Sequence, residues 1–246
     1  MRRFSAILLD DGGVMNDNTI RGPEWQRLVG EFLAPRLGGA PEAWAEANDV
    51  VFRQMWREFE ALLHPVLEAD IAGYFDFFGD QRARWLRDMC DRVGVTTPDD
   101  DQCLKLGLET EDFVLPRVQS GYPGATEAIR ALHAAGYRLG TASGQTSREL
   151  DGYLDGLGVR GLFPERLYGP DLVGAMKGTT AYYERVLADA HLEASETLVA
   201  DDQPGALARA AAVGLTTVLV TTDASQGQQA HFVVPLLADL PALLAG

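Results

Sequence analysis

The sequence has few cysteines and no long apolar run. Its 246 residues include two cysteines, Cys90 and Cys103, which are too few for a disulfide framework or a zinc cluster. Two unpaired thiols are typical of a reducing compartment, and no segment reaches the length of a membrane-spanning helix. The apolar stretch that follows Arg2 and Arg3 is too short for a signal peptide and runs directly into acidic residues. We therefore expect a cytoplasmic protein without a membrane partner.

Basic residues are also scarce. The chain has 21 lysines and arginines against 36 aspartates and glutamates, which gives a formal net charge of -15. No run of basic residues could neutralise phosphates, so the composition argues against nucleic acid as a partner. A small anionic substrate would have to be held locally, by a metal ion, a lysine or a helix N-terminus. Hydrophobic residues make up 46% of the chain, which is enough for one large domain or two small ones and leaves a monomer or a homodimer open.

From about Tyr122 onward, strand and helix patterns alternate. The pattern predicts helices over 123–136, 147–158, 179–192 and 204–214, and strands over 137–143, 196–202, 216–220 and 231–234, with a further short strand within 160–169. Strands that alternate with helices indicate a parallel sheet with right-handed crossovers. We therefore predict an α/β fold with a Rossmann-like parallel sheet and helices on both faces.

A segment with a helical pattern separates the first strand from this region. Apolar residues recur at helical spacing over 24–38, 43–64 and 79–94, with little strand signal between them. The first strand itself is the apolar run that stops at Asp10. We therefore expect a core formed by residues 1–17 and 117–246, interrupted by an all-helical insert over 18–116.

Polar residues that could bind a metal or take part in catalysis follow several of the predicted strands. In parallel sheets, sites form beyond the carboxyl ends of the strands, so side chains at these ends should meet. Acids gathered there would repel one another unless a cation held them, and oxygen ligands suit Mg²⁺. A carboxylate, a hydroxyl and a lysine beside Mg²⁺ form a constellation for phosphoryl transfer. The residues at the strand ends are Asp10 with Asp11, Ser143, and Asp201 with Asp202, and Lys177 lies in the loop before a helix.

The order and spacing of these residues resemble the haloacid dehalogenase-like hydrolase superfamily, in its branch with an α-helical cap inserted after the first strand. The first motif of that family is an apolar strand followed by Asp-x-Asp-Gly-Val and a further aspartate. The second motif is a strand that ends in Ser or Thr, the third is a lysine ahead of a helix, and the fourth is a strand that ends in paired acids. The matching positions are Asp10, Gly13, Val14, Asp17, Ser143, Lys177 and the segment VADDQPGALARAAAVG.

The resemblance implies a role for each matched position. Asp10 would be the nucleophile that forms an aspartyl intermediate, and Lys177 would neutralise the nucleophile and the transferred group. Ser143 and the N–H of Gly144 would hold phosphate oxygens. The ligands of Mg²⁺ would be Asp10, the carbonyl of Gly12, Asp201 and Asp202.

One departure from the family pattern concerns Gly12. The family has a second aspartate there, which protonates the leaving group and activates water. Such acid–base help is worth about 10²–10⁴-fold in rate. Asp11 would point to the opposite side of the strand from Asp10, because side chains alternate, and we assign it no chemical role. Two smaller departures are Gly144, where an asparagine often follows the serine, and glycine and threonines after Lys177 in place of prolines.

Three functions are consistent with these residues. The first is a Mg²⁺-dependent phosphatase of a small phosphorylated metabolite. The second is a 2-haloacid dehalogenase, for which Gly12 is no handicap because halide leaves without a proton. Dehalogenases of this kind need no metal, however, and lack the paired acids found at Asp201 and Asp202. The third is a non-catalytic binding protein that kept the fold. The substrate is left open, because the helical insert would set it.

Overall fold

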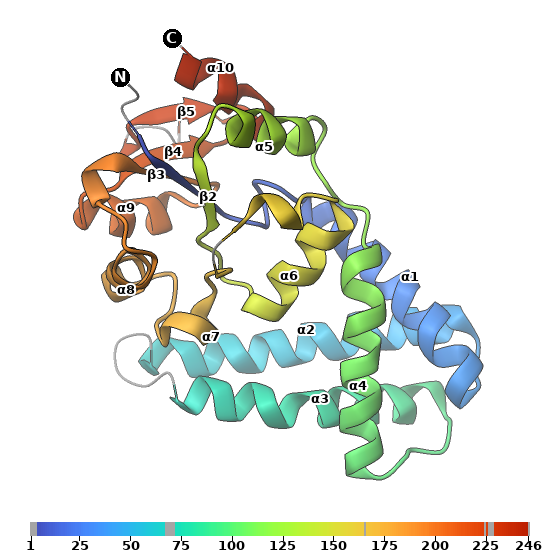
Figure 1. Cartoon of the computed structure of the whole chain (residues 1–246). Coiled ribbons are helices and arrows are strands. Elements are labelled where there is room, and N and C mark those ends of the chain that lie inside the picture. Colours follow the sequence, from blue (N-terminus) through green and yellow to red (C-terminus); the bar gives the residue numbers. More distant parts are fainter. Residues whose placement is uncertain (1–3, 67–71, 165, 224, 226–228, 246) are drawn as a thin grey trace. The chain divides into compact units, whose positions relative to one another are not determined.

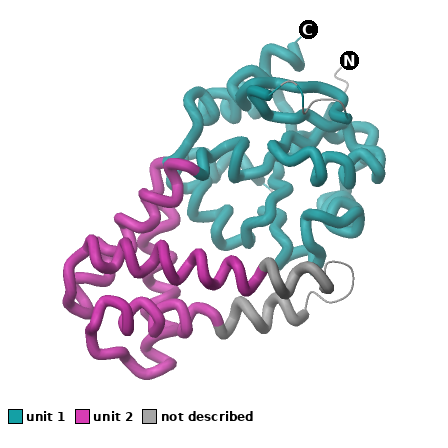
Figure 2. Tube along the Cα trace, turned by 180° about the vertical axis from the view of Figure 1, so that it is seen from behind, with its two compact units in different colours: residues 1–18, 120–246 teal, residues 19–119 magenta. Residues whose placement is uncertain are grey.

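The computed structural model describes residues 4–66, 72–164, 166–223, 225 and 229–245, with the backbone alone for 60–66 and 72–80. The chain divides into two compact units (Figure 2). One unit joins Met1–Asn18 to Ser120–Gly246 and holds every strand of the sheet, whereas the other, Thr19–Gln119, is helical.

The first unit is built on a five-stranded parallel sheet in the order β2-β1-β3-β4-β5. Helices α8 and α9 lie on one side of the sheet, and α5, α6 and α10 lie on the other (Figure 1). The prediction of an α/β fold with a parallel sheet and helices on both faces is therefore confirmed. The strands are β1 (Ala6–Leu9), β2 (Arg138–Thr141), β3 (Thr197–Asp201), β4 (Thr216–Val220) and β5 (Phe232–Val234). The helices are α5 (Ala125–Ala134), α6 (Ser147–Gly156), α7 (Pro170–Val173), α8 (Thr180–Ala190), α9 (Pro204–Ala212) and α10 (Leu240–Ala245), with short 3₁₀ turns η2 (Arg160–Leu162), η3 (Ala194–Glu196) and η5 (Leu237–Asp239).

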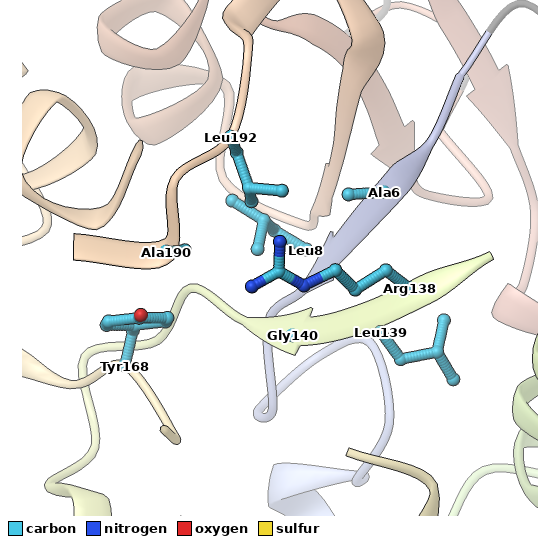
Figure 3. Close-up of a pocket in the computed structure, with 8 residues that line it drawn as sticks. All are labelled: Ala6, Leu8, Arg138, Leu139, Gly140, Tyr168, Ala190 and Leu192. Atoms are coloured by element: carbon cyan, nitrogen blue, oxygen red, sulfur yellow. The ribbon is translucent and has the colours of Figure 1, made fainter. Parts of the chain in front are cut away.

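Strand β1 is apolar along its whole length because the sheet is covered on both faces. Ile7 and Leu9 belong to the hydrophobic cluster that includes Ile129 of α5 and Leu150 of α6. Leu8 points to the opposite face, where it lines a cavity of about 10 Å³ together with residues of β2 and the end of α8 (Figure 3). A cavity of this size holds at most one water molecule. The sheet interior therefore has no room there for a substrate.

The second unit is a set of packed helices. They are α1 (Asn18–Leu37), α2 (Pro41–Val66), α3 (Ala72–Val93) and α4 (Asp100–Val114), followed by the 3₁₀ turn η1 (Leu115–Arg117). Trp44 and Leu86 are fully buried in it, and Cys90 and Cys103 are free, buried thiols. Burial raises the pKa of Cys90 to about 11, so this thiol is unreactive at neutral pH. Within the described part of the chain, no helix combines the length and the apolar character that crossing a membrane requires.

The short strand expected within 160–169 is a wrong prediction. The described residues of this segment contain the 3₁₀ turn η2 and no strand. The N–H of Phe163 closes this turn by donating to the carbonyl of Arg160, at 3.1 Å. Pro164 follows at once and has no N–H to give to a strand ladder. The local turn therefore prevails over the apolar pattern.

Candidate functional site

The register of the sheet brings the ends of β1 and β3 together. Leu9 pairs with Ala200 of β3 and with Thr141 of β2. The N–H of Asp10 donates to the carbonyl of Ala200 at 3.0 Å, which places Asp10 beside Asp201. The next strand in the chain, β2, lies on one side of β1, and β3 and the later strands lie on the other side. The strand order therefore reverses at β1, and sites of open α/β sheets form at such a point.

Lys177 lies in the loop before α8 and binds both acids. Its Nζ is 2.6 Å from Oδ2 of Asp10 and 2.7 Å from Oδ2 of Asp201. All three side chains are buried. Burial alone would lower the pKa of Lys177, but the charges of Asp10 and Asp201 raise it above its usual value. The other carboxylate oxygen of Asp10 accepts the N–H of Asp11 at 2.8 Å, so both of its oxygens are held in place.

The acids form a cluster that Lys177 does not neutralise. Ligand atoms of Asp10, Asp201 and Asp202 lie within 4.8 Å of one another. Three carboxylates and one ammonium group leave two negative charges in this space. Burial raises the pKa of Asp201 to about 6, although the ammonium of Lys177 opposes this shift. Burial also raises the pKa of Asp202, and its Oδ1 is buried without a hydrogen-bond partner among the described residues.

These properties fit a divalent cation with a preference for oxygen. A bound Mg²⁺ would neutralise the two uncompensated charges and would give the orphaned oxygen of Asp202 a partner. Buried polar atoms are normally paired, so an unpaired carboxylate oxygen in a cluster of acids is a specific observation. The residues present therefore suit the metal that the sequence predicts.

The loop after β1 approaches this cluster closely at Gly13. Gly13 has a φ of 82°, and a Cβ added to it would lie 2.1 Å from Oδ2 of Asp202. Both facts require glycine, because a side chain would be strained and would collide with the carboxylate. Gly12, immediately before it, is buried; the use of its carbonyl as a metal ligand stays a prediction.

Ser143 and Gly144 follow β2, the neighbour of β1. The strand ends at Thr141, two residues earlier than the sequence suggests. The N–H of Ser143 donates to the hydroxyl of Tyr182 at 2.9 Å, and its own hydroxyl donates to Oε1 of Gln145 at 2.5 Å. Gly144 is exposed, and a Cβ added to it would meet open space. The structure thus places these two residues beyond the same edge of the sheet as Asp10, and their contact with phosphate stays a prediction.

Two tyrosines of α8 belong to this region and were missed from the sequence. Tyr182 fixes the turn at Ser143, and its hydroxyl lies 2.8 Å from the carbonyl of Tyr168. The hydroxyl of Tyr183 is buried, and no residue that the structure describes forms a hydrogen bond with it. Burial raises the pKa of Tyr183, and the ammonium of Lys177 opposes the shift, so this phenol stays protonated near the acids. The available signal was a pair of tyrosines five and six residues after Lys177.

Asp11 turns away from the cluster and holds the loop. It is fully buried, and its Oδ1 accepts a hydrogen bond from Nδ2 of Asn16 at 2.7 Å. Asn16 in turn accepts one from the hydroxyl of Ser120 at 2.9 Å. Ser120 and Asn16 flank the two points at which the chain leaves and re-enters the α/β unit. Asp11 therefore fixes the backbone of both connections, which sequence reasoning did not assign to it.

Comparisons with known proteins agree with this arrangement. The structure resembles an L-2-haloacid dehalogenase from Xanthobacter autotrophicus, with a TM-score of 0.62, 17% identity and 99% of both chains covered. It also resembles the putative hydrolase YfnB from Bacillus subtilis bound to magnesium, with a TM-score of 0.65, 17% identity and 99% of both chains covered. A phosphatase from Thermococcus onnurineus has a TM-score of 0.57, 18% identity and 99% coverage of both chains. At these identities the likeness shows the fold alone.

The sequence comparisons are more specific about the family. No curated protein sequence matches the chain significantly. The family model for haloacid dehalogenase-like hydrolases matches residues 5–229, which is most of the chain. The cluster at the ends of β1 and β3 lies within this range. The chain therefore belongs to the haloacid dehalogenase-like hydrolase family.

Proposed function

We propose that this hydrolase is a Mg²⁺-dependent phosphatase of a small phosphorylated metabolite. The observation that carries the proposal is the cluster of Asp10, Asp201 and Asp202, in which two negative charges and one buried carboxylate oxygen have no partner among the described residues. A site that must accept a phosphate cannot remain so negative. Mg²⁺ bound by these three acids, and by the carbonyl of Gly12, would supply the charge neutralisation that a phosphoryl group needs.

Asp10 is the nucleophile of the proposed reaction. Its carboxylate is held at one oxygen by Lys177 and at the other by the N–H of Asp11, so it is oriented before the substrate arrives. One oxygen attacks phosphorus, the bond from phosphorus to the leaving group breaks, and an aspartyl phosphate forms. Water then attacks this intermediate, which releases inorganic phosphate and restores Asp10. Lys177 remains charged throughout and stabilises the transferred group.

The remaining contacts of the phosphate come from the turn after β2 in this proposal. The hydroxyl of Ser143 exchanges Gln145 for a phosphate oxygen by rotating about its Cα–Cβ bond, and the N–H of Gly144, an exposed residue, adds a second donor. The helical unit acts as the cap that selects the substrate. Because Gly12 offers no acid, substrates with good leaving groups, such as aryl or acyl phosphates, react faster than sugar phosphates.

A dehalogenase activity is the second candidate. The similarity to the fold of L-2-haloacid dehalogenases supports it, and so does Gly12, since halide departs without a proton. In that reaction Asp10 would attack carbon instead of phosphorus. The third carboxylate argues against it, because Asp202 adds a negative charge where an anionic haloacid would bind.

A panel of phosphorylated metabolites and 2-haloacids separates the two candidates. We expect phosphate release with Mg²⁺, none after chelation, and no halide release under either condition. The Asp10→Asn variant should be inactive, and the neighbouring Asp11→Asn variant is the matched control. Halide release without a metal would establish the dehalogenase instead, and release of neither product would contradict both.

A further inference from the structure

Gly12 has a backbone that admits a side chain, but the side chain of Asn18 occupies the space that its first atom would need. Gly12 is not among the described glycines with positive φ, so its conformation does not require glycine. A Cβ at this position would lie 2.8 Å from Oδ1 and 3.0 Å from Nδ2 of Asn18. The carboxamide of Asn18 therefore packs where the first atom of a side chain at position 12 would stand.

Asn18 is placed and equipped to bind a ligand. It is the first residue of α1 and belongs to the same compact unit as Gly12. Its side chain is exposed, and among the described residues no hydrogen-bond partner of its carboxamide is found. Gly12 lies two residues after Asp10 and directly before Gly13, which packs against Asp202. The free carboxamide thus stands beside the turn that follows the nucleophile and that approaches Asp202 at Gly13.

We propose that Asn18 is a catalytic residue of the phosphoryl-transfer site and that Gly12 is glycine in order to admit it. The inference rests on the proposed phosphatase activity. The carboxamide hydrogen-bonds the leaving-group oxygen or the attacking water, because an amide both donates and accepts. It exchanges no proton, so the site suits leaving groups that depart as stable anions. This assigns acyl and aryl phosphates as the substrate class.

The chemistry can be tested by exchanging the carboxamide for a carboxyl group of the same shape. Turnover of 4-nitrophenyl phosphate, acetyl phosphate and glucose 6-phosphate would be measured for the wild type, Asn18→Ala and Asn18→Asp. Asn18→Ala should lower kcat about fivefold, the worth of one hydrogen bond, without changing the Kd for Mg²⁺. Asn18→Asp should raise kcat at least about tenfold for glucose 6-phosphate, less for the activated esters, and should add an ionisation to the pH profile.

A second pair of variants tests whether Gly12 acts through Asn18. Gly12→Ala adds only the colliding Cβ, so it should displace the carboxamide and reproduce the loss caused by Asn18→Ala. The double variant Gly12→Ala/Asn18→Ala should lose no more than either single variant, since the effects share one cause. For the same reason, Gly12→Asp should gain activity only when it is combined with Asn18→Ala.

The outcomes separate the inference from the function on which it rests. If the wild type hydrolyses no phosphate ester, the phosphatase proposal fails and the role of Asn18 fails with it. If the wild type is active and both Asn18 variants keep its kcat, its leaving-group preference and its pH profile, only the role of Asn18 is overturned. Additive losses in the double variant would likewise show that Gly12 is independent of Asn18.

Discussion

The dipeptide Asp-Asp occurs twice at the edge of the sheet, after β1 and at the end of β3, and the two copies do different things. At β3 both acids join the cluster: Asp201 binds Lys177, and Asp202 keeps a buried oxygen that no described residue contacts by a hydrogen bond. At β1 only Asp10 joins the cluster. Asp11 is fully buried and binds Asn16.

The difference comes from the segment of chain after each pair. After β1 the chain turns through Gly12 and Gly13, and Asn16 folds back to meet Asp11. After β3 the chain enters α9 within two residues, and no described residue returns to pair with Oδ1 of Asp202. Of the two second acids, Asp11 is satisfied by the protein and supports structure, whereas Asp202 keeps an unpaired oxygen that is available to a metal or substrate. The second aspartate of the Asp-Asp pair therefore stabilises the loop after β1, whereas after β3 it is left free for a ligand.

The largest effect is expected at the first acid of the β1 pair. Asp10→Asn should reduce phosphate release by about 10⁴-fold or more, because an amide cannot form the acyl phosphate. Circular dichroism should show an unchanged fold. The control is Asp11→Asn, which should stay within a few fold of the wild type. A substantial rate in Asp10→Asn would mean that water or another residue attacks the substrate.

Truncation of the second acids should lower stability at Asp11 but not at Asp202. Asp11→Ala leaves the amide of Asn16 without its partner and should lower the free energy of unfolding by about 1–3 kcal/mol, measured with urea. Asp202→Ala in metal-free buffer removes an unpaired, partly buried charge and should not lower it. If both variants lose stability equally, the contrast between the two pairs is wrong.

The affinity for Mg²⁺ should fall at acid pH. Because burial raises the pKa of Asp201 to about 6, this group is protonated below that pH, and the metal must displace the proton. Affinity should therefore fall with decreasing pH, by about tenfold for each pH unit below 6. Calorimetric titrations at pH 7.5 and pH 5 measure this change. An affinity that is equal at both pH values would show that Asp201 is not a ligand.

The smallest effect concerns the glycines after the two pairs. A Cβ on Gly205, in the first turn of α9, would meet open space, so Gly205→Ala should raise stability by about 0.4–1 kcal/mol. Gly13→Ala should do the opposite, because it combines a positive φ with a collision at Asp202. Thermal unfolding of the two variants measures both signs. A stabilising Gly13→Ala would show that the loop does not need glycine there.

Much of the fold and part of the site could be predicted from the sequence. The predictable part depends on the order of strands and helices, and the rest depends on loop conformation. The meeting of Asp10 and Asp201 follows from parallel strands whose ends share one edge, and the motif order was enough to anticipate that Lys177 joins them. The contacts of Asp11 with Asn16 and of Tyr182 with Ser143 depend on how loops fold back, which periodicity does not encode. The expected strand within 160–169 was wrong because the turn at Phe163 and the missing N–H of Pro164 outweigh an apolar run.

Mg²⁺ titration of two matched variants tests the contrast most directly. Asp11→Asn and Asp202→Asn each replace one carboxylate oxygen by an amide in the second acid of a pair. In calorimetry at pH 7.5, Asp11→Asn should bind Mg²⁺ like the wild type, whereas Asp202→Asn should bind at least about tenfold more weakly because the site loses a charged ligand. Equal binding by both variants, or a loss confined to Asp11→Asn, would contradict the assignment of the metal to Asp10, Asp201 and Asp202.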